Sequence, residues 1–378
     1  MPDVLIYGDT FRSPELRHEV PLGVPDPFLY AEKDGSKHIA TSSMELPRLS
    51  ALGLFELHSS EELGSDELIA SGLSYPEVRT ELAVRAALRL GVREAVVPET
   101  FPLWLADRLR AEGVELAVDA SFFDERRRVK TTAEVAGIRR AQRAAEAAMD
   151  TARELLRRAE PNGEGLVLDG EPLTVERMKA AMNVTFAAHG TSADDFIVAP
   201  GAQGAVGHDM GSGAIAPGVP IVIDIWPRDN ESFVYSDMTR TFVVGDVPDD
   251  VRTWHRLCQE ALDRAISEIR AGADGRAIFD GTCEIFEAAG EPTQRTKEPG
   301  VPLADGFFHG LGHGVGLEVH EAPGLGLAAK LPLVAGDVVT VEPGLYRQGY
   351  GGVRLEDLVL VTENGAENLT DYPYDLAP

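Results

Sequence analysis

Two segments of this 378-residue chain predict β-hairpins that each carry an acidic residue on both arms. The midpoint between Asp224 and Asp237 falls inside a polar turn, and the midpoint between Glu342 and Glu356 is Gly349, inside a glycine-rich turn. Residues equidistant from a hairpin turn face each other with Cβ atoms about 5 Å apart, and like charges there are destabilising. Two such pairs in one chain predict that cations bind between them.

A histidine- and glycine-rich run lies between the two hairpins in the sequence. It holds His309, His313 and His320, with four glycines between Gly310 and Gly316. Glycine at this density disfavours a helix and lets the backbone approach a site closely. No glutamate follows His309 directly, so the run is not the His-Glu-x-x-His helix of zinc proteases. We expect these imidazoles to share a site with the carboxylates.

Four carboxylates and an imidazole form a hard, oxygen-rich ligand set. Such a set favours Mn(II), Co(II), Fe(II) or Zn(II) with open coordination positions over a closed structural zinc site. Two such ions can share a water and polarise a carbonyl, which predicts metal-assisted hydrolysis of an amide. The alternative is that arginines balance the acids: Arg228 or Arg240 for the aspartates, and Arg354 for Glu356.

The composition narrows the class of protein. Lysine and arginine number 35 against 62 acidic residues, a net charge of −27, which repels nucleic acid and anionic membranes. The two cysteines, Cys258 and Cys283, form no Cys-x-x-Cys motif, which disfavours thiolate zinc and disulfide frameworks. We expect no signal peptide and no membrane span, and therefore a cytoplasmic location.

The chain predicts two domains. Residues 1–124 alternate strand and helix patterns without a phosphate-binding glycine motif, which indicates a small α/β domain. From 125 to 378 the pattern changes, and Thr131 with Glu134 forms a capping box that opens a long helix. Two helices followed by strands then occur twice, and each half carries one of the hairpins. We interpret this order as a structural pseudo-repeat.

These stretches resemble the pita-bread metallopeptidases, the family of methionine aminopeptidase, aminopeptidase P and prolidase. The matching stretches are Asp224, Asp237-Met-Thr-Arg-Thr, the run from His309 to Glu321, Glu342-Pro-Gly and Arg354-Leu-Glu356. The resemblance covers about 125–370 and implies an α+β architecture. In it, a pita-bread catalytic domain (125–378) follows a smaller creatinase-like α/β domain (1–124).

The resemblance also implies the role of each metal ligand. Asp224 would chelate one metal, and Asp237 and Glu356 would bridge two. His313 and Glu342 would complete the shell of the other metal. Two divalent ions are expected, with Mn²⁺ first and Co²⁺, Zn²⁺ or Fe²⁺ as alternatives. A water or hydroxide bridging them would attack the scissile carbonyl.

Catalytic roles follow from the same resemblance. Glu342 would accept the proton, and His320 would stabilise the tetrahedral intermediate. His208 would contact the substrate at the scissile bond, and His309 would lie near the substrate pocket. Arg354, two residues before Glu356, is typical of the proline-specific branch.

One departure from the family is visible at Trp226. The family usually has glycine two residues after the first metal aspartate, and the turn before Asp237 is about two residues longer here. The tryptophan lies either beside the site or under the hairpin, and in the first case it would alter substrate access.

The expected activity is hydrolysis of the Xaa-Pro bond, with small peptides carrying proline at the second position as substrates. A dipeptidase acting as a homodimer is the leading interpretation. Aminopeptidase P activity on longer peptides and a non-prolyl hydrolase on the same scaffold are alternatives. A creatinase-like enzyme without metal or a non-catalytic binding module would require lost ligands, and this chain retains all five.

Overall fold

The computed structural model describes residues 2–163 and 165–378, and the chain divides into two compact units, Met1–Arg127 and Arg128–Pro378. The first unit is built on a six-stranded sheet of order β4-β3-β2-β1-β5-β6. Its β1–β2 and β2–β3 pairs are antiparallel, whereas the other pairs are parallel. The strands are β1 (Val4–Gly8), β2 (Phe28–Lys33), β3 (Ser36–Thr41), β4 (Glu56–Ser59), β5 (Glu94–Val97) and β6 (Glu115–Val118).

Helices cover both faces of this sheet because its central strands are apolar on both sides. Leu5 of β1 belongs to one buried cluster with residues of α4 and α5, whereas Val4 and Ile6 belong to another with residues of α1. The alternation follows the two-residue period of a strand. The helices are α1 (Pro14–Glu19), α2 (Leu46–Ser50), α3 (Ser65–Ala70), α4 (Tyr75–Arg89), α5 (Leu103–Ala111) and α6 (Ala120–Arg128).

The second unit begins with the long helix that the capping box predicts. The Thr131 side chain accepts from the backbone N–H of Glu134, and the Glu134 side chain accepts from that of Thr131. The first half comprises α7 (Thr132–Arg158), β7 (Glu160–Asn162), β8 (Gly165–Leu168), β9 (Glu171–Pro172), α8 (Val175–Ala188), β10 (Thr191–Ser192), β11 (Ile197–Pro200), the 3₁₀ turn Gly201–Ala205, β12 (Ile221–Ile225), β13 (Arg228–Asp229) and β14 (Met238–Phe242).

The second half repeats the order of two helices followed by strands. It comprises α9 (Asp249–Glu268), α10 (Gly275–Ala288), β15 (Gly312–Gly314), β16 (Glu321–Leu325), β17 (Val338–Val341), β18 (Gly344–Arg347), β19 (Gly351–Arg354), β20 (Asp357–Val361) and β21 (Ala366–Asn368). The sheets of this unit have the orders β7-β8-β9, β11-β12-β14 and β16-β15-β17-β20-β21, and β10 pairs with β13 and β18 with β19.

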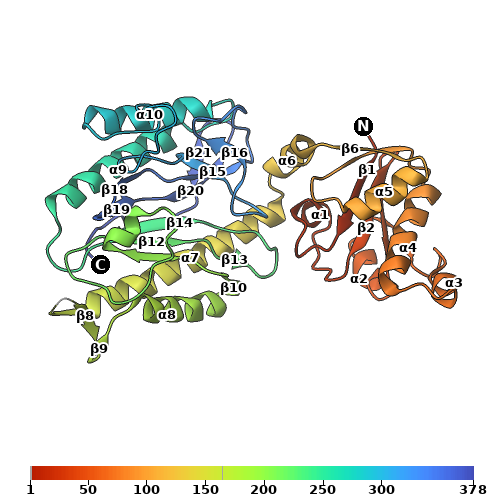
Figure 1. Ribbon diagram of the computed structural model, residues 1–378, viewed down its shortest axis with the longest axis horizontal. Helices are drawn as coiled ribbons and strands as arrows, with labels where there is room; N and C mark the ends of the chain where they lie inside the picture. The colour runs from red at the N-terminus through yellow and green to blue at the C-terminus, as the bar shows by residue number, and fades with distance from the viewer. Residues whose placement is uncertain (1, 164) are drawn as a thin grey trace. The chain divides into compact units, whose positions relative to one another are not determined.

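Each helix pair packs on the strands of its own half. Residues of α7 and α8 share a buried cluster with β11, β12 and β14, and residues of α9 and α10 share another with β17, β19 and β20. The strands therefore lie between the two helix pairs (Figure 1). A bridge between Thr239 and Glu356 joins the halves, which brings the two acidic hairpins together.

The second hairpin has the register that the sequence predicts. Val341 pairs with Asp357 on one side and Gly344 with Arg354 on the other. The same register on both sides places Glu342 opposite Glu356. The ladder divides at Pro343, which has no N–H to donate.

The register predicted for the first hairpin is wrong by two positions. Asp224 pairs with Thr239, and the bridge between Arg228 and Tyr235 continues that register. Asp237 therefore precedes β14 and lies diagonal to Asp224. Side chains two residues apart share one face of a strand, so both aspartates still point to the same side.

No helix among residues 2–163 and 165–378 combines the length and apolar character needed to span a bilayer.

Candidate metal centre

The four acidic residues converge where the two hairpins meet. Asp224 lies in β12 and Asp237 directly before β14, whereas Glu342 and Glu356 lie at the breaks between β17 and β18 and between β19 and β20. Ligand atoms of Asp237, Glu356 and His313 lie within 4.8 Å of one another. The His313 Nε2 atom lies 3.9 Å from Asp237 Oδ2 and 3.5 Å from Glu342 Oε1.

Two carboxylate oxygens in this cluster are buried without a hydrogen-bond partner. They are Oδ1 of Asp224 and Oδ1 of Asp237, and no donor reaches either within the described part of the chain. A buried carboxylate oxygen left unpaired costs several kcal/mol, roughly 2–7, so a partner is expected. Glu356 differs, because its Oε2 accepts from Thr239 Oγ1 at 2.7 Å.

The acids perturb one another strongly. Burial, and then the charges of Glu356, Asp224 and Glu342, raise the pKa of Asp237 well above its ordinary value. Burial likewise raises the pKa of Glu342 to about 7, although Arg354 opposes the shift. Burial and the neighbouring Glu342 raise the pKa of Glu356 as well. The protein alone therefore does not neutralise this cluster.

Arg354 is the cation that the structure places among the four acids. Its Nη2 donates to Asp224 Oδ2, and its Nη1 donates to Tyr346 Oη at 3.0 Å. The alternative in which Arg240 balances one of the aspartates is wrong, because Arg240 instead pairs with Asp357 at 2.9 Å. One guanidinium faces four carboxylates, so most of the negative charge needs another partner.

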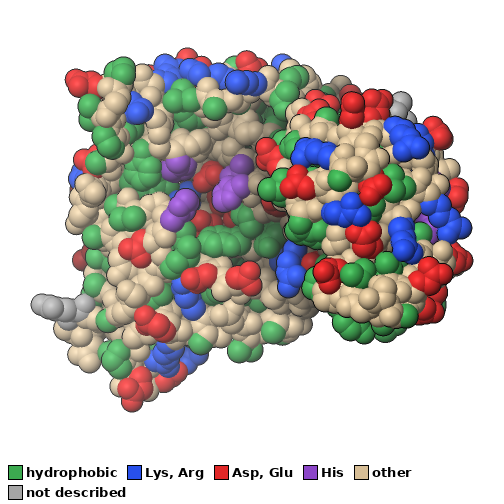
Figure 2. All heavy atoms as spheres, turned by 45° about the vertical axis from the view of Figure 1, so that its right-hand side comes forward, with side chains coloured by type: hydrophobic (Ala, Val, Ile, Leu, Met, Phe, Trp, Pro, Cys, Tyr) green, Lys and Arg blue, Asp and Glu red, His purple; other side chains and the backbone are tan. Residues whose placement is uncertain are grey.

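Histidine side chains lie close to the acidic cluster. Figure 2 shows histidine side chains around a depression with acidic side chains on its floor. His208 and His320 are exposed, and the His313 and His320 rings lie 4.1 Å apart between centroids. Burial lowers the pKa of His313 to about 4, and His320 contributes. A neutral imidazole is the form that binds metal.

His309 is held by a residue that the sequence did not single out. Its Nε2 lies 2.9 Å from Tyr346 Oη, and its Nδ1 lies 3.8 Å from Glu342 Oε2. Burial, and then the charge of Arg354, lower the pKa of His309 to about 3. Tyr346 thus connects His309 to Arg354. The sequence gave no signal for this contact, because Tyr346 lies 37 residues from His309 and the two meet only in the folded chain.

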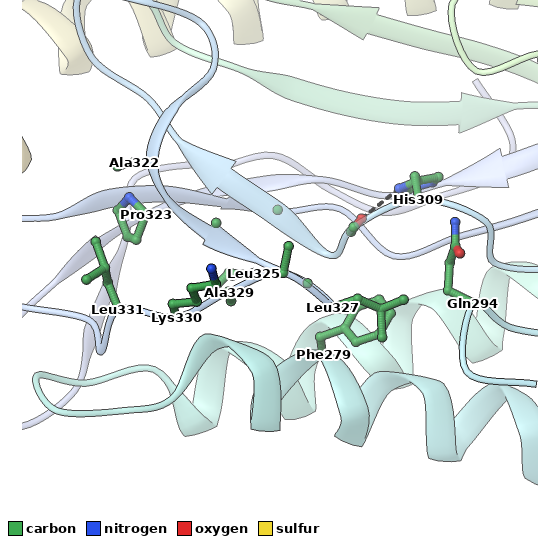
Figure 3. Close-up of a pocket in the computed structure, with 15 residues that line it drawn as sticks. Phe279, Gln294, His309, Ala322, Pro323, Leu325, Leu327, Ala329, Lys330 and Leu331 are labelled. Atoms are coloured by element: carbon green, nitrogen blue, oxygen red, sulfur yellow. Dashed lines mark hydrogen bonds between the residues drawn. The ribbon is translucent and has the colours of Figure 1, made fainter. Parts of the chain in front are cut away.

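A cavity of about 630 Å³ lies beside His309. Figure 3 shows Leu325 and Leu327 between the strands and α10, with Gln294 near His309 and Lys330 further along. The walls are mainly apolar, and Lys330 is the cation among the lining residues.

Trp226 is half-buried and packs against the core shared by α7, α8 and the first-half strands. Leu155 and Ala193 pack against the same core. Of the two positions that the sequence left open, the structure has the one under the hairpin.

The donor set fits divalent cations. Carboxylate oxygens with one imidazole suit hard to borderline ions, and the two unpaired buried oxygens offer free lone pairs to them. Asp224, Asp237, His313, Glu342 and Glu356 are the residues that could hold such ions.

Residues 136–363 match the model of metallopeptidase family M24. The chain is 38% identical over 177 residues to an Xaa-Pro dipeptidase of Pyrococcus furiosus, a stretch that spans 47% of either chain. The fold is similar to that of an Xaa-Pro dipeptidase from Bacillus anthracis, with a TM-score of 0.80 and 23% identity over 100% of this chain and 94% of that chain. It is also similar to an X-Pro aminopeptidase from Thermotoga maritima, with a TM-score of 0.79 and 22% identity over 99% and 97%.

These likenesses extend over both units and confirm the predicted fold, a pita-bread unit preceded by a smaller α/β unit. The family match covers well over half of the chain and includes all four acidic residues and His313. This chain therefore belongs to metallopeptidase family M24.

Proposed function

We propose that this protein is an exopeptidase that hydrolyses the bond between an N-terminal residue and a following proline. The observation that carries the proposal is the cluster of four carboxylates and His313, two of whose buried oxygens lack a partner, with histidine side chains close by. Relatives named Xaa-Pro dipeptidase support the choice of substrate.

The site would hold two divalent ions, and we propose that both are Mn²⁺. Their ligands would be Asp224, Asp237, His313, Glu342 and Glu356. Ions in such a site lower the pKa of water and polarise a carbonyl. Arg354 keeps Asp224 oriented, and Thr239 does the same for Glu356.

The remaining residues would act on the substrate. Glu342 accepts a proton at its carboxylate, which faces both His313 and His309. His320 donates a hydrogen bond to the oxygen of the scissile carbonyl, and His208 contacts the substrate at the same bond. The two rings lie close enough to interact, because burial and then the charge of His208 lower the pKa of His320. This proximity supports the assignment.

The activity is tested with purified protein freed of metal and reloaded with Mn²⁺ or Co²⁺. We expect cleavage of an Xaa-Pro dipeptide and none of the matched Xaa-Ala dipeptide. A dipeptidase should prefer the Xaa-Pro dipeptide to an Xaa-Pro tripeptide. Cleavage of Xaa-Ala at the same rate would contradict proline specificity, and no cleavage of any peptide would contradict the proposal.

Aminopeptidase P activity on longer peptides is the second candidate. The cavity beside His309 favours it, because about 630 Å³ exceeds the space that a single proline ring occupies. A higher kcat/KM for the tripeptide than for the dipeptide would select this alternative.

The homodimer and the cytoplasmic location stay predictions from the sequence. Sedimentation velocity of the purified protein tests the first: a mass of about twice the 40.7 kDa chain is expected.

A further inference from the structure

A buried ion pair connects the start of the second unit to the residue beside His320. Lys130 directly precedes the N-cap of α7, and its Nζ donates to Glu321 Oε1. Their side chains are only 2% and 3% exposed. The Lys130 backbone is held as well, because its N–H donates to Gly336 O at 3.2 Å. The backbone from which the Lys130 side chain extends is therefore held in place.

The Lys130–Glu321 pair also contacts the loop between β15 and β16. The backbone N–H of Glu318 donates to Glu321 Oε2 at 3.4 Å. Gly316 packs directly against the pair: a Cβ there would lie 2.7 Å from Glu321 Oε1 and 2.8 Å from Lys130 Cε. Only a residue without a side chain leaves room for the pair to meet beneath this loop.

The loop carries two contacts of the candidate metal centre. His320 is its last residue, and its ring lies 4.1 Å from that of His313. The backbone of Val319, also in this loop, raises the pKa of His313, which opposes the larger lowering by burial and by His320. His320 itself is exposed, so its own packing restrains it little. Its position depends on the neighbour that is anchored, Glu321.

We propose that Lys130 is a positioning residue for His320. The ammonium holds the Glu321 carboxylate, Glu321 holds the end of the loop, and the loop sets where the His320 ring stands relative to His313. Removing Lys130 leaves a buried carboxylate without its counter-ion, which drives it toward solvent. The inference rests on the proposed function, in which His320 contacts the scissile carbonyl oxygen.

A neighbouring buried ion pair offers a matched control. Arg128 lies two residues before Lys130 and pairs with Asp337 through hydrogen bonds of 3.0 and 2.7 Å, with side chains 7% and 0% exposed. Its side chain anchors the same segment to the turn before β17, through Asp337 and the carbonyl oxygen of Pro332, rather than to the loop of His320. Arg128→Met and Lys130→Met therefore break similar pairs with different neighbours.

The first measurement compares kcat, KM, Mn²⁺ content and Tm of the two variants with Xaa-Pro substrate. Lys130→Met should lower kcat by on the order of 10- to 100-fold, because a displacement of about 1 Å has effects of that size. Its KM and metal content should stay close to wild type. Arg128→Met should lower Tm by a similar amount yet retain kcat, and Lys130→Arg should recover part of the loss. Equal loss of kcat in both methionine variants, or an unchanged kcat in Lys130→Met, would overturn the inference.

The second measurement needs no substrate. In the zinc-loaded protein, the ring NMR signals of His320 should shift in Lys130→Met and stay in place in Arg128→Met. Should Lys130→Met not fold, Glu321→Gln removes the same charge pairing at nearly constant volume and takes its place. If the wild type cleaves no peptide, the proposed function fails, while the NMR comparison still decides whether Lys130 positions His320. Unchanged His320 signals in all variants would refute that role.

Discussion

At the scale of single residues, the candidate site is defined by what its carboxylates lack. Asp224 and Asp237 each keep one buried oxygen without a partner, whereas the nearby Asp229 and Asp357 have every carboxylate oxygen in a hydrogen bond or ion pair. All four are buried aspartates of one unit. Asp229 and Asp357 are therefore fully paired within the protein, whereas Asp224 and Asp237 each have an oxygen available to bind a cation.

Asp237→Asn should abolish metal binding at the candidate site. Asp237 is one of the three residues whose ligand atoms cluster within 4.8 Å, and the substitution removes its charge with little change in shape. Changes in groups that only support a ligand cost about 10–100-fold, so at least about 100-fold loss of activity is expected here. Isothermal titration with Mn²⁺ and peptide hydrolysis measure the effect. Asp229→Asn is the control and should bind Mn²⁺ normally; full activity of Asp237→Asn would contradict the assignment.

Asp229 should stabilise the fold in a pH-dependent manner. Burial by itself raises its pKa, but hydrogen bonds from Arg140 and Ser232 outweigh burial and hold the pKa below its ordinary value. A carboxyl group whose pKa is lowered by folding stabilises the protein at pH values above its unfolded-state pKa of about 3.9. That stability is lost as the pH falls through the folded-state pKa.

The test is urea unfolding of metal-free wild type and Asp229→Asn. At pH 7 the variant should be less stable by about 2 kcal/mol, a figure kept modest because Arg140 is 35% exposed. The difference should shrink as the pH falls below about 4. A difference that grows toward acid would have the wrong sign for a lowered pKa.

At the scale of elements, one bridge and one strand assemble the site. The bridge between Thr239 and Glu356 joins the two hairpins, and β15 brings His313 beside β17. The backbone N–H of His313 donates to Thr340 Oγ1 at 3.1 Å. The glycines on either side of His313 let β15 approach its neighbours closely.

Gly312→Ala should displace β15 and with it His313. A Cβ at Gly312 would lie 2.0 Å from the carbonyl oxygen of Thr340, and backbone cannot yield as a side chain tip can. We expect a loss of at least about 2 kcal/mol of stability and weaker Mn²⁺ binding. Gly324→Ala is the matched control, because Gly324 lies opposite His313 in β16 and a Cβ there meets nothing within 4 Å. Thermal denaturation and metal titration of both variants measure the effect, and equal behaviour would disprove it.

At the scale of the whole molecule, the chain consists of two compact units, and the acidic cluster lies entirely in the second. The hydrophobic clusters follow the same division: two lie within Met1–Arg127 and three within Arg128–Pro378. Each unit therefore has its own core to unfold.

Metal removal should destabilise the second unit selectively. A ligand present at 100 times its Kd stabilises the state that binds it by about 2.7 kcal/mol, or about 5–10 °C for a unit of this size. Scanning calorimetry of the protein with EDTA and after Mn²⁺ reloading should show one transition that moves and one that does not. Equal shifts of all transitions, or none, would contradict the location of the site.

Much of the site was predictable because hairpin geometry is local. Glu342 and Glu356 are symmetric about Gly349, and the structure pairs them in that register. For Asp224 and Asp237 the predicted register is two positions off, because the segment from 226 to 237 contains its own bridge and the short strand β13. The error was harmless because an even shift keeps both side chains on one face.

The sequence by itself predicted two domains, the repeated order of helices and strands, and a list of acids and histidines that could bind metal. All of these follow from patterns within a few tens of residues. Only the tertiary structure decided which arginine faces the acids, that Tyr346 connects His309 to Arg354, and that Lys130 meets Glu321. The contacts of His309 with Tyr346 and of Lys130 with Glu321 join residues 37 and 191 positions apart. No local pattern in the sequence encodes contacts over such separations, because they form only when the elements pack.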